Sequence, residues 1–193
     1  GLATVNVLFG DVNPSGHLAE TFPKKLSDNP SYLFYGGEKN DTDYREGIFV
    51  GYRYYDRKEM DVLFPFGHGL SYTTFAYTGL RLSAGEMKDT DTLTATVTVK
   101  NTGDRPGKTV VQLYVGDRES SVFRPVRELK GFEKVSLQPG ETKTVEMEVA
   151  IPDLAYYNET EKRYEVDTGA YQVQVGTNSA EANLTADFTV SGE

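Results

Sequence analysis

The sequence predicts a mainly β protein, most of which is an antiparallel, immunoglobulin-like β-sandwich. From Phe75 onward, apolar and polar residues alternate in short runs, a pattern typical of strands with one buried face. Turn-forming residues separate these runs, as at positions 138–140 (Gln-Pro-Gly) and 167–169 (Asp-Thr-Gly). About seven such strands within about 115 residues are the pattern of a two-sheet sandwich.

The segment before Phe75 is organised differently, with few long periodic runs and many glycines and aromatic residues. Residues 2–9 predict a helix, because Gly10 stands where a glycine commonly ends one. The apolar stripe of this helix has no evident partner nearby in the sequence. Two short strands are expected at residues 18–22 and 48–55. A loop is expected at residues 24–37 and a connector between the two units at residues 65–74.

We therefore place a boundary between two units, residues 1–74 and residues 75–193. The second unit is expected to fold independently as a sandwich of about seven or eight strands. Its strands are expected at residues 75–82, 93–100, 111–115, 129–137, 144–149, 171–175 and 184–190. Its core is expected to contain Val97, Val99, Val111, Leu113, Val145, Met147, Tyr171, Val173 and Phe188.

The composition of this 193-residue chain argues against several functional classes. The formal charge is −9 with acidic and basic residues mixed, whereas nucleic acids and anionic membranes bind to basic patches. Because cysteine is absent, disulfides and thiolate chemistry are excluded, and a reducing, cytoplasmic location is slightly favoured. No apolar run of about 18 residues is present to span a membrane.

Four sequence blocks follow one another in the first unit: GDVNPSG, AETFP, YREGIFVGYRYYD and LFPFGHGLSYTTF. In this order they resemble the end of the second catalytic-region domain, an α/β sandwich, of family-3 glycoside hydrolases, the β-glucosidase family. The blocks VKNTGDRPGKTVVQLYVGD, RPVRELKGFEKVSLQPGETKTV, LAYYNE and GAYQVQVG then resemble the fibronectin type III-like domain that ends many of these enzymes. The resemblance covers essentially all of the chain, and one departure is Tyr164, where many relatives have tryptophan.

This resemblance implies a fibronectin type III-like sandwich preceded by the C-terminal remnant of an α/β sandwich domain. In the family the aspartate nucleophile lies on an N-terminal barrel, and in most members the acid/base glutamate precedes the position of residue 1. We therefore expect no catalytic residue here, no cofactor, and no hydrolysis by this chain alone. The expected partners are the barrel with the upstream α/β portion, in the same polypeptide or a separate chain, and a β-glucoside or oligosaccharide substrate. A helix that begins at the chain start without a cap also indicates that residue 1 is an internal or processing boundary.

Aromatic residues of the first unit are candidates for the rim of a substrate pocket. Tyr32, Phe34 and Tyr35 lie in a loop bounded by proline and glycine. Their rings could stack on the C–H faces of a sugar or pack between domains. For Tyr52 and Tyr54, within the expected strand at residues 48–55, packing between domains is the favoured interpretation.

Glu46 is the fourth rim candidate, because it lies in a segment rich in aromatic residues. A retaining glycosidase requires two carboxylates about 5–5.5 Å apart, and the sequence offers no obvious second one. The favoured interpretation is therefore a structural contact of Glu46 with Arg45 or Arg53.

No metal site is expected. His17 and His68 lack a second ligand at suitable spacing, and we expect His68, between two glycines, to bond to the backbone. Oxygen-bearing side chains cluster at residues 38–43, but Arg45 stands where a further ligand would be needed. A solvated loop is expected there.

Three functions remain open on the sequence. The chain could be the C-terminal structural segment of a β-glucosidase-like enzyme, which would explain residues 1–74. It could be a stand-alone carbohydrate-binding or adhesion module, because sandwiches serve both roles. It could also be the same segment of a β-xylosidase-type or arabinofuranosidase-type family member.

Overall fold

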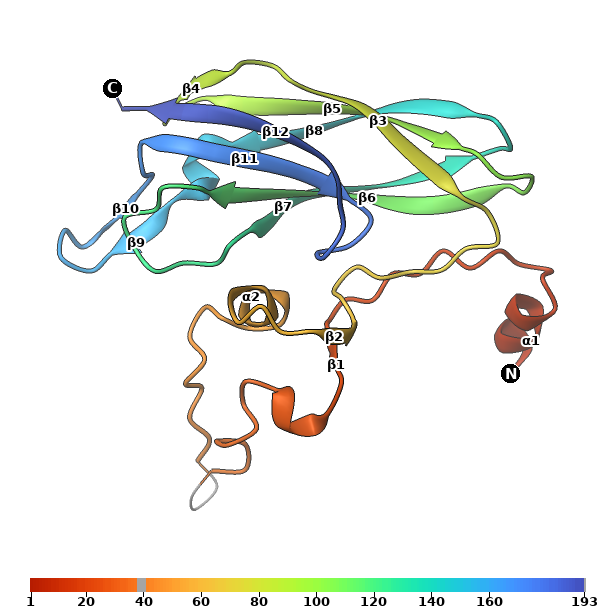
Figure 1. Ribbon diagram of the computed structural model, residues 1–193, viewed down its shortest axis with the longest axis horizontal. Helices are drawn as coiled ribbons and strands as arrows, with labels where there is room; N and C mark the ends of the chain where they lie inside the picture. The colour runs from red at the N-terminus through yellow and green to blue at the C-terminus, as the bar shows by residue number, and fades with distance from the viewer. Residues whose placement is uncertain (38–40, 193) are drawn as a thin grey trace.

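The protein is a two-sheet β-sandwich with an irregular N-terminal segment that lies along one side of it (Figure 1). It is described from a computed structural model, which defines residues 1–37 and 41–192. A five-stranded sheet in the order β4-β12-β11-β6-β7 faces a three-stranded sheet in the order β3-β5-β8. The strands are β3 (Phe75–Leu82), β4 (Glu86–Lys88), β5 (Thr92–Asn101), β6 (Gly107–Asp117), β7 (Glu128–Leu137), β8 (Thr142–Ala150), β11 (Gly169–Gly176) and β12 (Ala182–Ser191).

The core of the sandwich is formed by the inward-facing residues of the two sheets. All nine residues that the alternation predicts for its centre are buried in one cluster, which confirms the predicted fold class. The sequence did not predict β4, because three residues are too few to show an alternation. It also missed the hairpin of β9 (Tyr156–Asn158) and β10 (Arg163–Glu165), which follows the 3₁₀ helix η2 (Ile151–Leu154).

Strand β6 is buried on both of its faces. Leu113 points into the core, but the alternating residues Gln112 and Tyr114, which should face solvent, are only 3% and 2% exposed. The N-terminal segment covers them: the Gln112 side-chain amide donates to the backbone oxygen of Gly67 (3.3 Å), and Tyr52 packs edge-on against Tyr114. Burial raises the pKa of the Tyr114 hydroxyl. The outer face of β6 is thus a docking surface for the first 74 residues.

The N-terminal segment has few regular elements, and these are short. They are α1 (Leu2–Leu8), β1 (Phe22–Pro23), the 3₁₀ helix η1 (Leu26–Asp28), α2 (Tyr52–Arg57) and β2 (Val62–Phe64). The structure confirms the predicted first helix. The predicted strand at residues 18–22 is largely wrong, because only β1 pairs with β2. Leu18 instead exchanges backbone hydrogen bonds with His68 and Gly67 of the connector.

The predicted strand at residues 48–55 is wrong. The chain turns at Glu46–Phe49 and then forms α2, which begins after Gly51. Gly51 has φ 58° and ψ −135°, a conformation that side chains disfavour, so the extended chain ends there. The large residues that suggested a strand lie on the helix instead, where Tyr52 and Tyr55 are buried one turn apart.

Histidines anchor the connector. His17 accepts the Val110 amide at Nε2 (3.4 Å), so its Nδ1 donates to the Gly67 carbonyl (2.6 Å). The backbone of His68 bonds to Leu18 and Pro65, whereas its ring stacks on Phe64 with centroids 5.0 Å apart.

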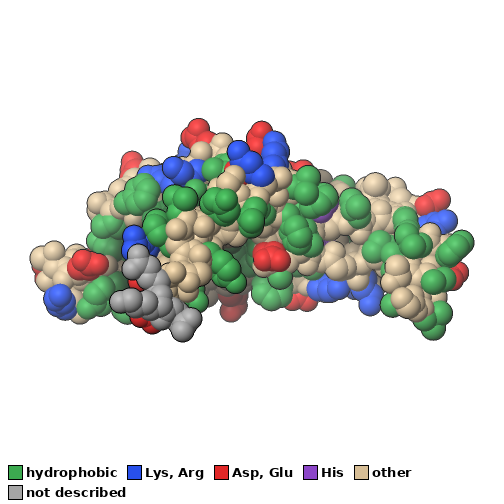
Figure 2. All heavy atoms as spheres, turned by 90° about the horizontal axis from the view of Figure 1, so that it is seen from below, with side chains coloured by type: hydrophobic (Ala, Val, Ile, Leu, Met, Phe, Trp, Pro, Cys, Tyr) green, Lys and Arg blue, Asp and Glu red, His purple; other side chains and the backbone are tan. Residues whose placement is uncertain are grey.

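Much of the apolar surface of the N-terminal segment faces outward, and Figure 2 shows hydrophobic side chains spread over the face seen from this side. Helix α1 buries none of its residues, and Leu2, Leu8 and Phe9 are 76%, 72% and 81% exposed. In the described part of the chain, no helix has the length and apolar character needed to cross a bilayer.

Candidate functional site

A pocket of about 310 Å³ lies where the N-terminal segment meets a loop of the sandwich. Three parts of the chain form it: residues 30–34 and 45–49 of the N-terminal segment, helix α2 with Lys58, and the β6–β7 loop. Its lining, as far as the described residues go, combines aromatic and cationic side chains with a single carboxylate. The lining residues are Pro30, Phe34, Arg45, Glu46, Phe49, Tyr54, Arg57, Lys58 and Phe123.

Glu46 supplies that carboxylate. Its Oε2 is buried and has no hydrogen-bond partner among the described residues. The expected contact with arginine is absent from that part of the chain: Arg45 pairs with Asp43 (2.6 Å), and Arg53 lies 3.8 Å from Glu128. A buried carboxylate oxygen is costly unless a donor reaches it. Glu46, which lines the pocket, therefore carries an acceptor oxygen that no donor of the described residues reaches.

Phe123 is the contribution of the sandwich to this pocket. Its ring packs against Phe49 with centroids 4.8 Å apart, and the Arg57 guanidinium lies 4.3 Å from its ring centre. Phe123 is still 66% exposed, so its ring is available to a ligand. The sequence did not identify Phe123, because it lies about 75 residues from Glu46 and nothing in its neighbourhood marks it as part of the same site.

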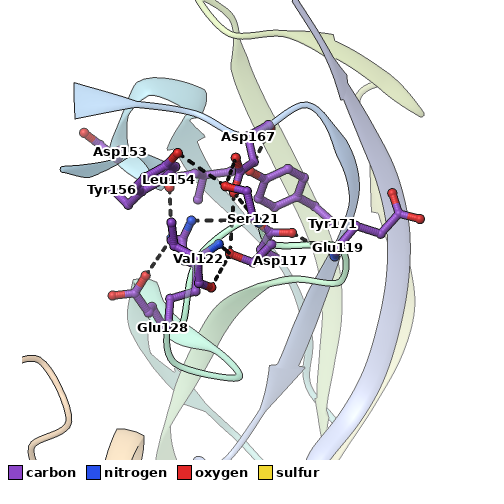
Figure 3. Close-up of polar contacts among 12 residues, drawn as sticks. Asp117, Glu119, Ser121, Val122, Glu128, Asp153, Leu154, Tyr156, Asp167 and Tyr171 are labelled. Atoms are coloured by element: carbon purple, nitrogen blue, oxygen red, sulfur yellow. Dashed lines mark hydrogen bonds and ion pairs between the residues drawn. The ribbon is translucent and has the colours of Figure 1, made fainter. Parts of the chain in front are cut away.

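A polar network fixes the β6–β7 loop that carries Phe123 (Figure 3). The backbone and the hydroxyl of Ser121 donate to the two carboxylate oxygens of Asp167 at 3.1 and 2.7 Å. Arg124, whose side chain is 9% exposed, donates to the Leu154 carbonyl (2.9 Å) and to Glu128 (3.1 Å). The loop is thereby tied to the sandwich at both ends, which holds Phe123 in place.

A buried ion pair in the same loop faces a second hollow. Asp117 and Arg124 lie 3.7 Å apart, and burial raises the pKa of the Asp117 carboxyl despite that neighbour. The hollow, of about 280 Å³, is also lined by Arg57 and Arg118. Arg57 therefore borders both hollows.

Helix α2 is held against the sandwich by two specific contacts. The Tyr52 hydroxyl accepts the Leu129 amide at 2.8 Å, and Arg127 donates to Asp56 at 2.8 Å. Burial outweighs this ion pair and raises the pKa of the Asp56 carboxyl. The prediction that Tyr52 packs between the two units is confirmed, whereas Tyr54 lines the pocket.

Only two of the four rim candidates meet in the pocket. Phe34 and Glu46 line it, whereas Tyr32 and Tyr35 are 47% and 83% exposed and lie outside it. Tyr35 instead borders an adjoining hollow of about 570 Å³, together with Phe34 and Asp43. Of the oxygen-rich run at residues 38–43, positions 38–40 lie outside the described residues.

Comparison with known proteins identifies the family. The model of the Glycosyl hydrolase family 3 C-terminal domain matches residues 1–72, and that of the Fibronectin type III-like domain matches residues 109–179. The chain belongs to glycosyl hydrolase family 3. Within the family it corresponds to the C-terminal part of the β-glucosidases described next.

The relatives of this family-3 chain are similar along its whole length. Thermostable beta-glucosidase B of Acetivibrio thermocellus is 51% identical over 99% of the chain, which spans 25% of that relative. A crystal structure of a GH3 beta-glucosidase from Bifidobacterium adolescentis aligns with a TM-score of 0.92 at 42% identity. The alignment covers 98% of this chain and 28% of the Bifidobacterium chain. The crystal structure of a beta-glucosidase from Kluyveromyces marxianus in complex with glucose aligns with a TM-score of 0.89 at 44% identity. This alignment covers 98% of this chain and 23% of the Kluyveromyces chain. The chain thus spans about a quarter of the relatives that it matches.

Proposed function

We propose that this chain is the C-terminal structural segment of an enzyme that hydrolyses β-glucosidic bonds with retention, its catalytic carboxylates lying outside residues 1–193. The observation that carries this proposal is the 51% identity to a thermostable β-glucosidase over 99% of the chain. A free-standing sandwich would have no use for residues 1–72, which match the Glycosyl hydrolase family 3 C-terminal domain. This observation favours an enzyme segment over a carbohydrate-binding or adhesion module.

The geometry of the pocket favours a structural role for this chain rather than a catalytic one. Retaining hydrolysis requires a second carboxylate about 5–5.5 Å from the first. Among the described residues, Glu46 is the only acidic one in the lining of its pocket. The chain alone is therefore expected to be inactive toward aryl β-glucosides.

The remaining part of the enzyme is the proposed partner of the N-terminal segment. The apolar side chains of α1 are exposed here, and burying them would release about 25 cal/mol for each Å² of apolar surface. A barrel and an upstream α/β portion, in the same polypeptide or in a second chain, would supply the covering surface.

We further propose that Phe34 and Glu46, with Phe123 from the sandwich, border the substrate site of the complete enzyme, and that Tyr32 and Tyr35 lie at its outer edge. The support is the unpartnered buried oxygen of Glu46 beside three phenylalanine rings. A sugar or aryl ring could stack on these rings while one hydroxyl donates to Glu46.

A chimera tests both proposals. This chain would replace the matching last quarter of the Acetivibrio thermocellus relative, and hydrolysis of an aryl β-glucoside would be measured for the chimera, the truncated relative and this chain alone. Activity is expected for the chimera only. Turnover by this chain alone, abolished by Glu46→Gln, would place the catalytic residues within it.

Rim variants in the chimera test the pocket. Glu46→Gln and Phe123→Ala should raise KM for cellobiose about three- to tenfold with a smaller change in kcat, because they remove substrate binding. Glu133→Gln and Phe132→Ala are matched controls, since both side chains are exposed on β7, outside the pocket. Unchanged KM in an active chimera would remove the rim role and leave the enzyme assignment intact.

Comparing glucosides with xylosides and arabinofuranosides in the full-length native enzyme would decide between β-glucosidase and the β-xylosidase-type alternative. The β-glucosidase relatives favour the first.

A further inference from the structure

A second groove lies on the sandwich, away from the pocket with Glu46. Its volume is about 600 Å³, and it lies where the β4–β5 turn, η2 and the β9–β10 hairpin meet. The lining includes Asp89 and Thr90 from the turn, Tyr164 and Glu165 from the hairpin, and Asp167 and Thr168 from the link to β11. The hairpin projects from one end of the sandwich in Figure 1.

An exposed aromatic ring stands at this groove and is held from behind. Tyr164 is 74% exposed and lies opposite Tyr157 in the hairpin, with ring centroids 5.3 Å apart in an edge-on arrangement. Glu165 locks the hairpin, because it accepts hydrogen bonds from Asn158 (2.6 Å) and Arg163 (2.7 Å). The Tyr164 ring is therefore carried on a braced hairpin and is bordered on one side by Tyr157.

Asp89, which lines the groove, also carries an acceptor oxygen that the described residues leave without a donor. Asp89 Oδ1 is buried and has no hydrogen-bond partner among the described residues. The other carboxylates are occupied: Asn158 and Arg163 donate to Glu165, and Ser121 donates to Asp167. Burying an acceptor without a donor is costly, so a ligand that brings a hydroxyl group would be stabilised there.

We propose that this groove is a non-catalytic binding site for a neutral gluco-oligosaccharide, in which a pyranose ring stacks on Tyr164 and a sugar hydroxyl donates to Asp89. The acidic lining repels anionic ligands such as nucleic acids, phosphates and uronic acids. The guanidinium of Arg163 opposes a strongly cationic ligand, and the many polar groups disfavour an apolar one. A ring with apolar C–H faces and hydroxyl edges satisfies both the aromatic platform and the free acceptor. This site is independent of the proposed hydrolase function.

The test measures cellotetraose binding to the full 193-residue chain by calorimetry and by NMR. Saturable binding in the millimolar range or tighter is expected, with shifts at the β4–β5 turn and the β9–β10 hairpin. Tyr164→Ala should weaken binding about tenfold or more, and Asp89→Ala several-fold, whereas Tyr164→Trp should preserve it. Phe132→Ala is the matched control, since its ring is similarly exposed, at 67%, on β7.

Two further variants separate this groove from the pocket with Glu46. Phe123→Ala and Glu46→Gln should leave the binding constant unchanged; if they abolish binding, the sugar occupies the pocket and the groove proposal is wrong. No binding at about 10 mM cellotetraose would also overturn it. Salt-sensitive binding of tetralysine in place of the sugar would overturn it as well.

Discussion

The sandwich and the N-terminal segment differ in how much of their apolar surface is buried. The sandwich closes on itself: Val97, Leu113 and Val173 are fully buried between its two sheets. The N-terminal segment leaves Leu8 and Phe9 more than 70% exposed and buries aromatic residues mainly where it contacts the sandwich. The sandwich therefore has a complete core of its own, whereas much of the apolar surface of the first 74 residues is left uncovered by the described residues.

The contact between the two regions is specific and is made by several parts of the N-terminal segment. One part of it is α2, whose Tyr52 and Asp56 bond to Leu129 and Arg127. Phe123 extends from the sandwich toward the same helix and completes the candidate pocket. The sandwich thus contributes to the site by positioning α2 and by adding one aromatic ring.

The largest expected difference is in local stability. In the isolated chain, the free energy of opening should be below about 1 kcal/mol for the amides of residues 2–22. For the amides of the sandwich strands it should approach the global free energy of unfolding, which is about 5–15 kcal/mol for a typical domain. Hydrogen exchange on a dilute monomer measures both. Equal protection in the two regions would contradict the idea that the N-terminal segment lacks a partner.

A core truncation should cost the next largest amount. Leu113→Ala is expected to lower the free energy of unfolding by about 2–5 kcal/mol, because Leu113 is fully buried between the sheets. Leu33→Ala is the matched control: this side chain is 81% exposed in the N-terminal segment, and its loss should cost less than about 0.5 kcal/mol. Chemical denaturation gives both values. A similar cost for the two variants would erase the contrast between the regions.

Removing one hydroxyl should loosen the contact between the regions. Tyr52→Phe deprives the Leu129 amide of its 2.8 Å acceptor and should cost about 1–3 kcal/mol. Exchange should rise at Leu129 and in α2, with little change at the centre of the sandwich. Tyr44→Phe, at an 84% exposed tyrosine, should have no effect. If Tyr52→Phe left exchange in α2 unchanged, other contacts would be holding the helix.

The smallest expected effect is a pH dependence at the same contact. Burial raises the pKa of Asp56 in the folded protein above its ordinary 3.8. At pH values between 3.8 and the raised pKa, the Asp56 carboxyl is mostly protonated in the folded protein and mostly ionised in the unfolded chain. The stability of the wild type relative to Asp56→Asn should therefore be greatest below pH 3.8 and fall as pH rises through that window. Denaturation midpoints at several pH values measure it. An advantage that grows with pH would show that attraction to Arg127 outweighs burial.

Local patterns determined what depends on local spacing. The alternation from Phe75 onward was enough to predict the sandwich and its nine core residues, because successive side chains of a strand point to opposite faces and every second one is buried. The ordered blocks along the chain were enough to predict the family. Helix α1 followed from its apolar run and Gly10.

Only the tertiary structure decided which faces meet. Residues 48–55 contain large side chains on all sides, yet a turn and a helix replace the strand there, with Gly47 in the turn and Gly51 before the helix both at positive φ. Gln112 and Tyr114 follow the pattern of outward-facing residues, yet docking of the N-terminal segment buries them. Phe123 and Glu46 share a pocket because two distant loops converge there. Such contacts arise between segments far apart in the chain, so no local pattern encodes them, whereas the pleat of a strand and the turn of a helix repeat within a few residues.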